Sequence, residues 1–287
     1  MSRSAPWVRE AAPAKVTLSL RVLRARDDGY HDIEAFTVTA SAPRDLVTLQ
    51  RTRRRRITVR VEPPDSAPTG RENLALHAVE AMWPSIALDG GLRLTLRKRI
   101  PAGAGLGGGS ADAAAVLRAL GPHAAMTEER VLEIAGWIGS DVPFCVHGVP
   151  AWMRGRGEVL EPVGPVGPTM LVVAVPGFSC STPAVYRAWD DLGGPRAARE
   201  LDAPPALRHV VGSLVNDLEP AAEHVEPRLV AFRRRLEELV GRPALLCGSG
   251  SAYAAGFPNE TDAAGAAERA RRELDSTSVW ATRTVPS

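Results

Sequence analysis

Residues 101–117 read PAGAGLGGGSADAAAVL, a glycine-rich loop that leads directly into an alanine-rich segment. Without a Cβ atom, glycine lets the backbone adopt a positive φ and lets N–H groups approach an anion closely. The helix expected from Ser110 onward would offer unpaired N–H donors and the positive end of its dipole to the same anion. The segment therefore predicts a phosphate cradle, built from glycines at positions 103, 105, 107, 108 and 109 and completed by the Ser110 hydroxyl.

Other glycine-rich sites fit this segment less well. Gly103, Gly105 and Gly108 match the GxGxxG dinucleotide fingerprint, but several strands and a helix precede them and no clear acidic residue follows about 20 residues later. A P-loop needs a lysine before the final hydroxyl residue, and Gly109 occupies that position here. A purely structural turn would lose backbone entropy at five glycines without a compensating gain.

Length and composition limit the class of protein. The 287 residues are 45% hydrophobic and carry a net charge of +2, so we expect a folded core and no nucleic-acid partner. The first 15 residues lack an apolar signal core, and the longest apolar run, residues 170–175, is too short to cross a bilayer. We expect a cytoplasmic protein with no membrane partner. Three widely spaced cysteines without a zinc-type pattern predict buried, reduced thiols at positions 145, 180 and 247.

Hydrophobic periodicity predicts strands, one helix and a basic turn before the glycine loop. The expected strands cover residues 14–23, 32–40, 46–50, 57–61 and 92–99, and the helix covers residues 71–82. Residues 53–56, RRRR, would join the third and fourth strands as a hairpin turn. This basic run is either a nucleic-acid patch or a solvated loop, and the solvated loop is favoured.

After the loop, helices are predicted at residues 110–120 and, capped by Thr127, up to residue 138, with short strands between residues 143 and 160. The Pro/Gly stretch EPVGPVGP at residues 161–168 predicts a boundary between domains 1–165 and 166–287. In the second domain we expect strands at residues 169–175, 244–247, 252–257 and 278–283, and helices at residues 182–190, 226–240 and 261–274. The fold class is α+β.

Three segments, in order, resemble the three motifs of the GHMP kinases. They are APAKVTLSLRV at residues 12–22, the glycine loop, and LLCGSGSAYAAGF at residues 245–257. The resemblance implies the two-domain GHMP kinase fold, with an N-terminal ribosomal-protein-S5-like α/β domain and a C-terminal ferredoxin-like α+β domain. DGYH at residues 28–31 is similar to the branch of the family that phosphorylates diphosphocytidyl methylerythritol, a small-molecule substrate. A different GHMP kinase, of the homoserine or mevalonate type, and a non-catalytic sensor on the same fold remain as alternatives.

The resemblance also implies roles for individual residues. Asp141 matches the catalytic base and Lys15 the cation beside it, although alone they would be read as a helix cap and a strand-end charge. Residues that match substrate-binding positions are Thr17, Tyr30, His31, Thr182 and Tyr186. Thr17 stands where the family usually has Asn, so one polar contact to substrate is in question. Ordinary packing is the alternative for Tyr30, His31 and Tyr186, and helix capping is the alternative for Thr182.

ATP and Mg²⁺ are the cofactors that the resemblance implies. The nucleotide would contact Asn73, Lys98, Pro101, Gly103, Gly105, Leu106, Gly107, Gly108, Gly109 and Ser110. The alternative for Lys98 is a solvated charge on a strand. Ser110 is the expected protein contact of the metal, whereas Asp112 either reaches it through water or only stabilises the helix dipole. We expect a monomer or a homodimer.

Overall fold

The structure is a computed structural model that describes residues 8–86, 90–164, 167–194 and 215–285. The chain divides into two compact units, both made of discontinuous segments. Unit 1 comprises the segment up to Ala14, then Pro43–Ala102 and Gly107–His147, and unit 2 comprises Lys15–Ala42, Gly103–Leu106 and the segment from Gly148 onward. These units do not follow the predicted division at residues 165 and 166, because the first two strands and the glycine loop contribute to both. That division stays a prediction.

Two long strands, β1 (Val8–Ala25) and β2 (His31–Thr52), pair with each other and run through both units. The sequence predicted two strands, at residues 32–40 and 46–50, where β2 is continuous. Pro43, which cannot donate a backbone hydrogen bond, lies between the part of β2 that pairs with β5 and the part that pairs with β4. The proline is therefore tolerated inside the strand.

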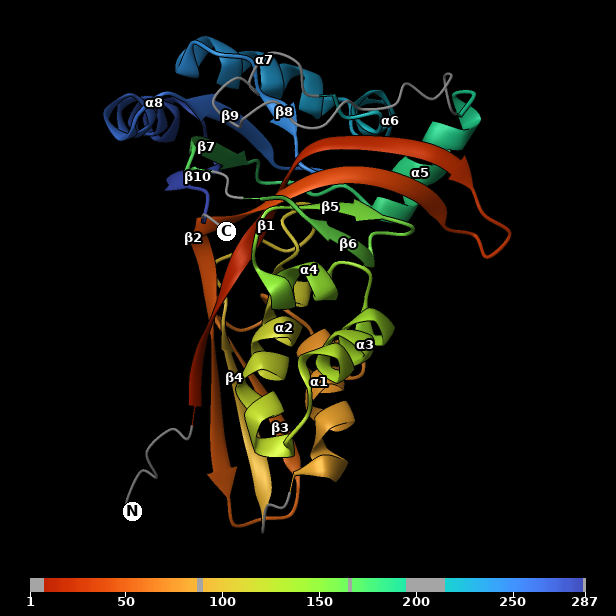
Figure 1. Cartoon of the computed structure of the whole chain (residues 1–287). Coiled ribbons are helices and arrows are strands. Elements are labelled where there is room, and N and C mark those ends of the chain that lie inside the picture. The colour runs from red at the N-terminus through yellow and green to blue at the C-terminus, as the bar shows by residue number, and fades with distance from the viewer. Residues whose placement is uncertain (1–7, 87–89, 165–166, 195–214, 286–287) are drawn as a thin grey trace. The chain divides into compact units, whose positions relative to one another are not determined.

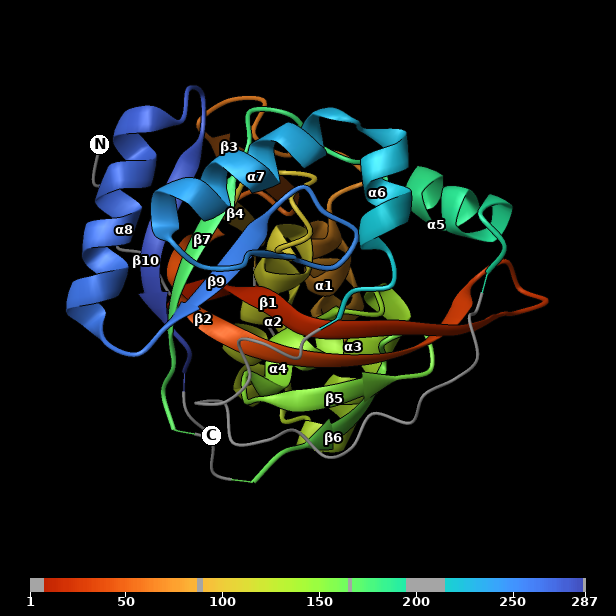
Figure 2. The ribbon, with the colours of Figure 1, turned by 90° about the horizontal axis from the view of Figure 1, so that it is seen from above.

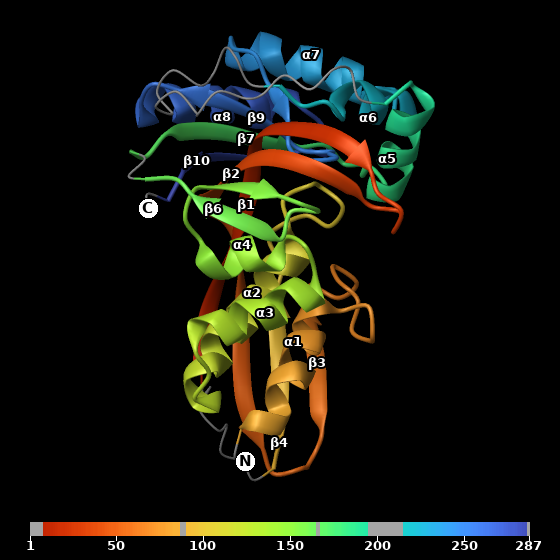
Figure 3. The same cartoon turned by 45° about the vertical axis from the view of Figure 1, so that its right-hand side comes forward.

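In unit 1, helices pack beside a small sheet (Figures 1 and 3). Strand β4 (Gly91–Arg97) is antiparallel to the second part of β2 and parallel to β3 (Ile57–Glu62). The predicted hairpin at residues 53–56 is therefore wrong, because β4 lies between the two strands that this turn connects. The four arginines of the turn are exposed, as expected of a solvated loop.

The helices of unit 1 surround α2. They are α1 (Leu74–Met82), α2 (Gly108–Leu120), α3 (Glu128–Ile138) and α4 (Val142–His147), with short 3₁₀ turns at Trp83–Ser85 and Gly121–Ala124. Helix α2 is buried from Ala111 to Leu117 because its small alanine side chains let neighbouring helices approach closely. Thr127 caps α3 by accepting a hydrogen bond from the Arg130 N–H, as predicted. The short strands predicted after residue 143 begin instead with helix α4, and only β5 (Ala151–Arg154) and β6 (Val159–Pro162) of unit 2 are strands.

Unit 2 contains a four-stranded antiparallel sheet in the order β10-β7-β9-β8. The strands are β7 (Met170–Val175), β8 (Leu245–Leu246), β9 (Tyr253–Phe257) and β10 (Ser278–Arg283). Helices α7 (Arg228–Val240) and α8 (Glu260–Glu273) lie together over this sheet, as Figure 2 shows. The predicted strand at residues 278–283 is confirmed, and the other predicted strands and helices of this region are found within a few residues of their expected ends.

The remaining elements of unit 2 are α5 (Thr182–Asp191) and α6 (Glu219–Val225), which pack together, and the pairing of β5 with β6 and with the first part of β2. Helix α6 was not predicted because its seven residues are short and rich in polar side chains. All three cysteines are buried and free, as expected. Helices and strands in two sheets confirm the predicted α+β class.

Candidate active site

The glycine loop adopts the left-handed backbone that its composition predicts. Gly103, Gly105 and Gly107 have φ values of +67°, +75° and +67°. Gly107 is the N-cap of α2, which begins at Gly108, two residues earlier than predicted. No side chain caps this end of α2, so the N–H groups of its first turn point out of the helix without the usual capping oxygen. Such an end can accept a phosphate group.

The middle of the loop is packed tightly within unit 2. A Cβ atom on Gly105 would lie 2.1 Å from the Cys247 carbonyl oxygen and 3.0 Å from that of Gly250. The Ala104 carbonyl accepts a hydrogen bond from the Ala252 N–H, at 3.0 Å, and the Leu106 carbonyl accepts one from the Lys15 N–H, at 3.1 Å. The first, second and third motifs of the sequence are therefore in direct backbone contact here.

Lys15 lies on β1 in a buried polar row. Its Nζ donates to the Thr17 hydroxyl at 3.5 Å, and that hydroxyl shares a hydrogen bond with the Thr37 hydroxyl at 3.4 Å. Burial raises the pKa of the nearby Cys247 thiol to about 12, although the Lys15 ammonium acts in the opposite direction. The thiol is thus protonated at neutral pH and is a poor nucleophile.

Asp141 belongs to unit 1, whereas Lys15 belongs to unit 2. Asp141 directly precedes α4, and its carbonyl accepts a hydrogen bond from the Cys145 N–H at 3.2 Å. Its backbone carbonyl therefore takes part in the first turn of the helix, and the residue is half-buried. The role of Lys15 and Asp141 as a catalytic pair stays a prediction.

His31 is the centre of an aromatic and acidic cluster in unit 2. Its Nε2 lies 2.8 Å from Asp190 Oδ1, and its ring stacks on Tyr186 with centroids 4.8 Å apart and planes 27° apart. Trp189 contacts the same ring edge-on at 5.5 Å. Tyr186, Trp189 and Asp190 are spaced three and four residues apart on α5, so they share one helix face. The sequence analysis missed Trp189 and Asp190, although this spacing could have identified them.

Tyr30 differs from its neighbour in being 54% exposed. The Arg156 guanidinium lies 4.9 Å from the centroid of its ring, a cation–π contact. Tyr186, which matches a substrate-binding position, stacks on His31 itself in this structure. A ring face of Tyr30 exposed to solvent can still stack on a ligand.

Thr182 links α5 to the third motif. Its hydroxyl shares a 2.7 Å hydrogen bond with the Ser249 hydroxyl, whereas the N-cap of α5 is Ser181. Thr182 is therefore not the cap that the alternative expected. Buried Asn216 holds the same loop by donating to the carbonyls of Leu246 and Gly248, at 2.8 and 2.7 Å. Ser249, within the third motif, and Asn216 were not predicted, because only the fold brings Thr182 and Asn216 to this loop.

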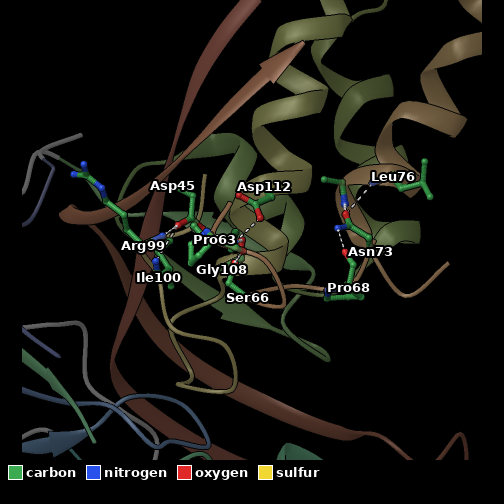
Figure 4. Close-up of polar contacts among 12 residues, drawn as sticks. Asp45, Pro63, Ser66, Pro68, Asn73, Leu76, Arg99, Ile100, Gly108 and Asp112 are labelled. Carbon is green, nitrogen blue, oxygen red and sulfur yellow. Dashed lines mark hydrogen bonds and ion pairs between the residues drawn. The ribbon is translucent and has the colours of Figure 1, made fainter. Parts of the chain in front are cut away.

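Lys98 directly follows β4 and pairs with Asp45 and Asp112 of unit 1, the two aspartates labelled in Figure 4. Its Nζ forms ion pairs with Asp45 and, at 2.5 Å, with Asp112, and its side chain is only 5% exposed. The solvated-charge alternative for Lys98 is therefore wrong. Asp45, which the sequence analysis missed, also accepts hydrogen bonds from the N–H groups of Arg99 and Ile100.

Charge and burial compete in this group. Burial lowers the pKa of Lys98, but the charges of Asp112 and Asp45 outweigh this effect, so the pKa lies above its ordinary value. Burial raises the pKa of Asp112 well above its usual range, only partly offset by the Lys98 ammonium. One oxygen of Asp112, Oδ1, is buried without a hydrogen-bond partner. The group is thus tightly held but leaves one buried oxygen without a hydrogen bond.

Asn73 is the N-cap of α1. Its side chain accepts from the N–H groups of Ala75 and Leu76, at 2.9 and 3.1 Å, and donates to the Pro68 carbonyl at 2.6 Å, as Figure 4 shows in part. Asn73 is only 5% exposed, and its side chain is used to cap α1. Contact of Asn73 and Lys98 with a nucleotide stays a prediction.

No group of three or more His, Cys, Asp or Glu side chains suited to a metal occurs in the part of the chain that the structure describes. A Mg²⁺ ion here would take most of its ligands from phosphate and water, as is usual for this ion. Ser110, in the first turn of α2, and the unpartnered Asp112 Oδ1 are oxygen donors consistent with that arrangement. Within the same described ranges, no helix is both long enough and apolar enough to cross a membrane.

Comparison with known proteins gives consistent results. Residues 73–149 match the model of the GHMP kinases N-terminal domain. The 4-diphosphocytidyl-2-C-methyl-D-erythritol kinase of Moorella thermoacetica is 39% identical, over 84% of this chain and 87% of the relative. The enzyme of the same name from Geobacter metallireducens is 34% identical, over 92% and 94% of the two chains.

Similarity extends to solved structures. A crystal structure of 4-(cytidine 5'-diphospho)-2C-methyl-D-erythritol kinase is 35% identical, with a TM-score of 0.79 over 96% of this chain and 99% of the other. The match confirms the GHMP kinase fold that the three motifs predicted. With its glycine loop, its motif order and this degree of identity, the chain belongs to the 4-diphosphocytidyl-2-C-methyl-D-erythritol kinase family, a branch of the GHMP kinases.

Proposed function

We propose that this chain transfers the γ-phosphoryl group of ATP to the 2-hydroxyl of 4-diphosphocytidyl-2-C-methyl-D-erythritol, giving the 2-phosphate and ADP. This reaction is a step of non-mevalonate isoprenoid biosynthesis. The observation that carries the proposal is the loop of left-handed glycines ending at the uncapped start of α2, in a chain with relatives that are named for this activity. We place the reaction in the cytoplasm, catalysed by a monomer or homodimer.

Phosphoryl transfer depends mainly on positioning and on stabilising negative charge. The backbone N–H groups from Gly103 to Ser110 would hold the phosphates, because they lie in a loop that leaves no room for Cβ atoms at its centre. Mg²⁺ bound through Ser110 would neutralise phosphate charge. Asp112 Oδ1, buried and unpartnered, supports a cation nearby.

The chain's own residues would activate the acceptor. Asp141 would accept the proton of the 2-hydroxyl as a general base. The Lys15 ammonium would stabilise negative charge on the transferred phosphoryl group. Thr17, bonded to Lys15, offers a hydroxyl to the substrate where the family usually has an amide. Its smaller reach removes at most one polar contact.

The His31 cluster would recognise the cytosine. Tyr30 offers an exposed ring face for stacking, and His31 can bond the pyrimidine edge with its Nδ1 while Asp190 holds Nε2. Tyr186 fixes the plane of the His31 ring. Thr182, at the start of the same helix, bonds Ser249 of the third-motif loop.

A coupled ADP-release assay tests the proposal with three alcohols: the diphosphocytidyl substrate, homoserine and mevalonate. Turnover of the first that needs Mg²⁺ and is lost in Asp141→Asn supports it. Asp275→Asn, in an exposed turn, is the control and should be fully active. Turnover of homoserine or mevalonate alone would assign the chain to another GHMP activity, and ligand binding without turnover of any of the three would indicate a sensor.

A further inference from the structure

Asp45, Lys98 and Asp112 form a buried group, here called the loop clamp, that joins the two ends of the glycine loop. We infer that the loop clamp is a positioning unit, which sets the geometry of the loop for the nucleotide. This role of Lys98 replaces the direct contact with the nucleotide that the sequence predicted. The inference rests on the proposed function for the role of the loop, but the contacts that carry it do not depend on that function.

The first half of the loop clamp holds the chain where it leaves β4. Asp45 Oδ1 accepts hydrogen bonds from the Arg99 and Ile100 N–H groups, at 2.5 and 2.9 Å. The next residue is Pro101, which has no N–H to donate. The last two donors before the glycine loop therefore both end on one buried carboxylate, as Figure 4 shows.

The second half holds the chain where it enters α2. Lys98 Nζ pairs with Asp112 Oδ2 at 2.5 Å and lies 3.4 Å from the Gly108 carbonyl oxygen, which belongs to the first residue of the helix. The same ammonium pairs with Asp45. The Lys98 ammonium therefore bridges Asp45, which holds the end of β4, and Asp112, which lies near the start of α2.

The burial of Lys98 indicates that it acts by positioning the glycine loop. The side chains of Lys98, Asp45 and Asp112 are 5%, 0% and 3% exposed. To reach a phosphate, the ammonium would have to leave a carboxylate in the interior without its counter-ion, which is strongly unfavourable. The loop clamp fixes the distance between the two ends of the loop. This distance matters because the rate of an enzyme falls steeply when bound groups are misplaced by as little as about 1 Å.

The test compares Lys98→Met with Arg97→Met, the neighbouring residue, whose side chain is 59% exposed and pairs with Glu62 on the surface. We expect Lys98→Met to raise the KM for ATP about tenfold to a hundredfold, the range for a misplaced phosphate site, with the KM for the diphosphocytidyl substrate nearly unchanged. Arg97→Met should leave both constants unchanged.

Hydrogen–deuterium exchange supplies a second readout that needs no activity. Lys98→Met should speed exchange of the amides between residues 99 and 110 but not those of β7, in the four-stranded sheet. Asp45→Asn keeps an oxygen for the Arg99 and Ile100 N–H groups, so it should protect these amides better than Asp45→Ala. If Lys98→Met does not fold, the two Asp45 variants decide the question by the same readouts.

The inference is overturned if folded Lys98→Met keeps the wild-type KM for ATP and wild-type exchange in the loop, or if both KM values rise equally. A wild-type chain that does not phosphorylate the diphosphocytidyl substrate would instead contradict the proposed function, and the exchange of the loop amides would still decide whether the loop clamp exists.

Discussion

Gly105→Ala tests whether the packed centre of the glycine loop is needed for nucleotide binding. The new Cβ would lie 2.1 Å from the Cys247 carbonyl oxygen, whereas such contacts essentially never fall below 3.0 Å. The third-motif loop or the glycine loop must therefore shift by at least 0.9 Å, the difference between these two distances. A shift of about 1 Å at a reacting site can lower activity about a hundredfold.

The effect on stability has two parts. Alanine at a φ of +75° is strained by about 1–2 kcal/mol, and forcing an extra carbon into a packed site costs about 1–3 kcal/mol. The free energy of unfolding should fall by about 2–5 kcal/mol in total, which lowers Tm by roughly 10 °C in a protein of this size.

Gly241→Ala is the matched control, because Gly241 has a φ of +70° and nothing within 4 Å of its Cβ position. It should show the strain alone, about 1–2 kcal/mol, with an unchanged KM for ATP. The measurements are Tm by calorimetry and steady-state kinetics at varied ATP. If Gly105→Ala matches Gly241→Ala in Tm and keeps the wild-type KM for ATP, the tight contact with Cys247 has no functional importance.

Three further outcomes are expected. Asp141→Asn should lower kcat about 10²–10⁴-fold, the usual contribution of a general base, with little change in either KM. A normal kcat in a steady-state assay would exclude Asp141 as the general base. Asp190→Asn should raise the KM for the diphosphocytidyl substrate about tenfold or more, because the charge-assisted bond to His31 is lost. Asp191→Asn is the exposed control. An equal rise in the KM for ATP would argue against cytosine recognition. Burial, reinforced by Glu223 and opposed by Arg233, raises the pKa of Glu219 from 4.5 to about 7, so its contribution to stability is present below pH 4.5 and is lost as the pH rises through 7. In urea unfolding, the loss of stability between pH 4.5 and 8 should be about 3 kcal/mol smaller in Glu219→Gln than in the wild type, because buried Asp112 also has a raised pKa and contributes to both slopes. Identical slopes in the two proteins would contradict the shift of Glu219.

Local chemistry made much of the fold predictable. The Thr127 cap, the helix beginning at Thr182 and the strand at residues 278–283 follow from capping and periodicity, and the structure contains all three. The glycine loop was also predictable, because positive φ values at Gly103 and Gly105 require this residue type.

What sequence reasoning missed depends on long-range pairing. Helix α4 begins as an apolar run, VPFCVH, which periodicity cannot separate from a buried strand. The turn at residues 53–56 looks like a hairpin until β4, about 35 residues later in the chain, is inserted between its strands. Neither result could be read from the segment alone.

The same limit applies to the candidate site. Lys98 looks like a surface charge on an alternating strand, and only the fold brings Asp45 and Asp112 to its ammonium. Asp190 was within reach of prediction, since it lies four residues after Tyr186 on an evident helix. Asp45 was not, because it lies 53 residues from Lys98 and has no motif around it.

The transfer itself can be followed by incubating the chain with ATP labelled at the γ-phosphoryl group, Mg²⁺ and the diphosphocytidyl substrate, and locating the label in the product by phosphorus and carbon NMR. We expect one new phosphomonoester, attached to C2 of the methylerythritol unit, formed in equal amount to ADP. Label found only in inorganic phosphate, or on a different hydroxyl, would contradict the proposed reaction.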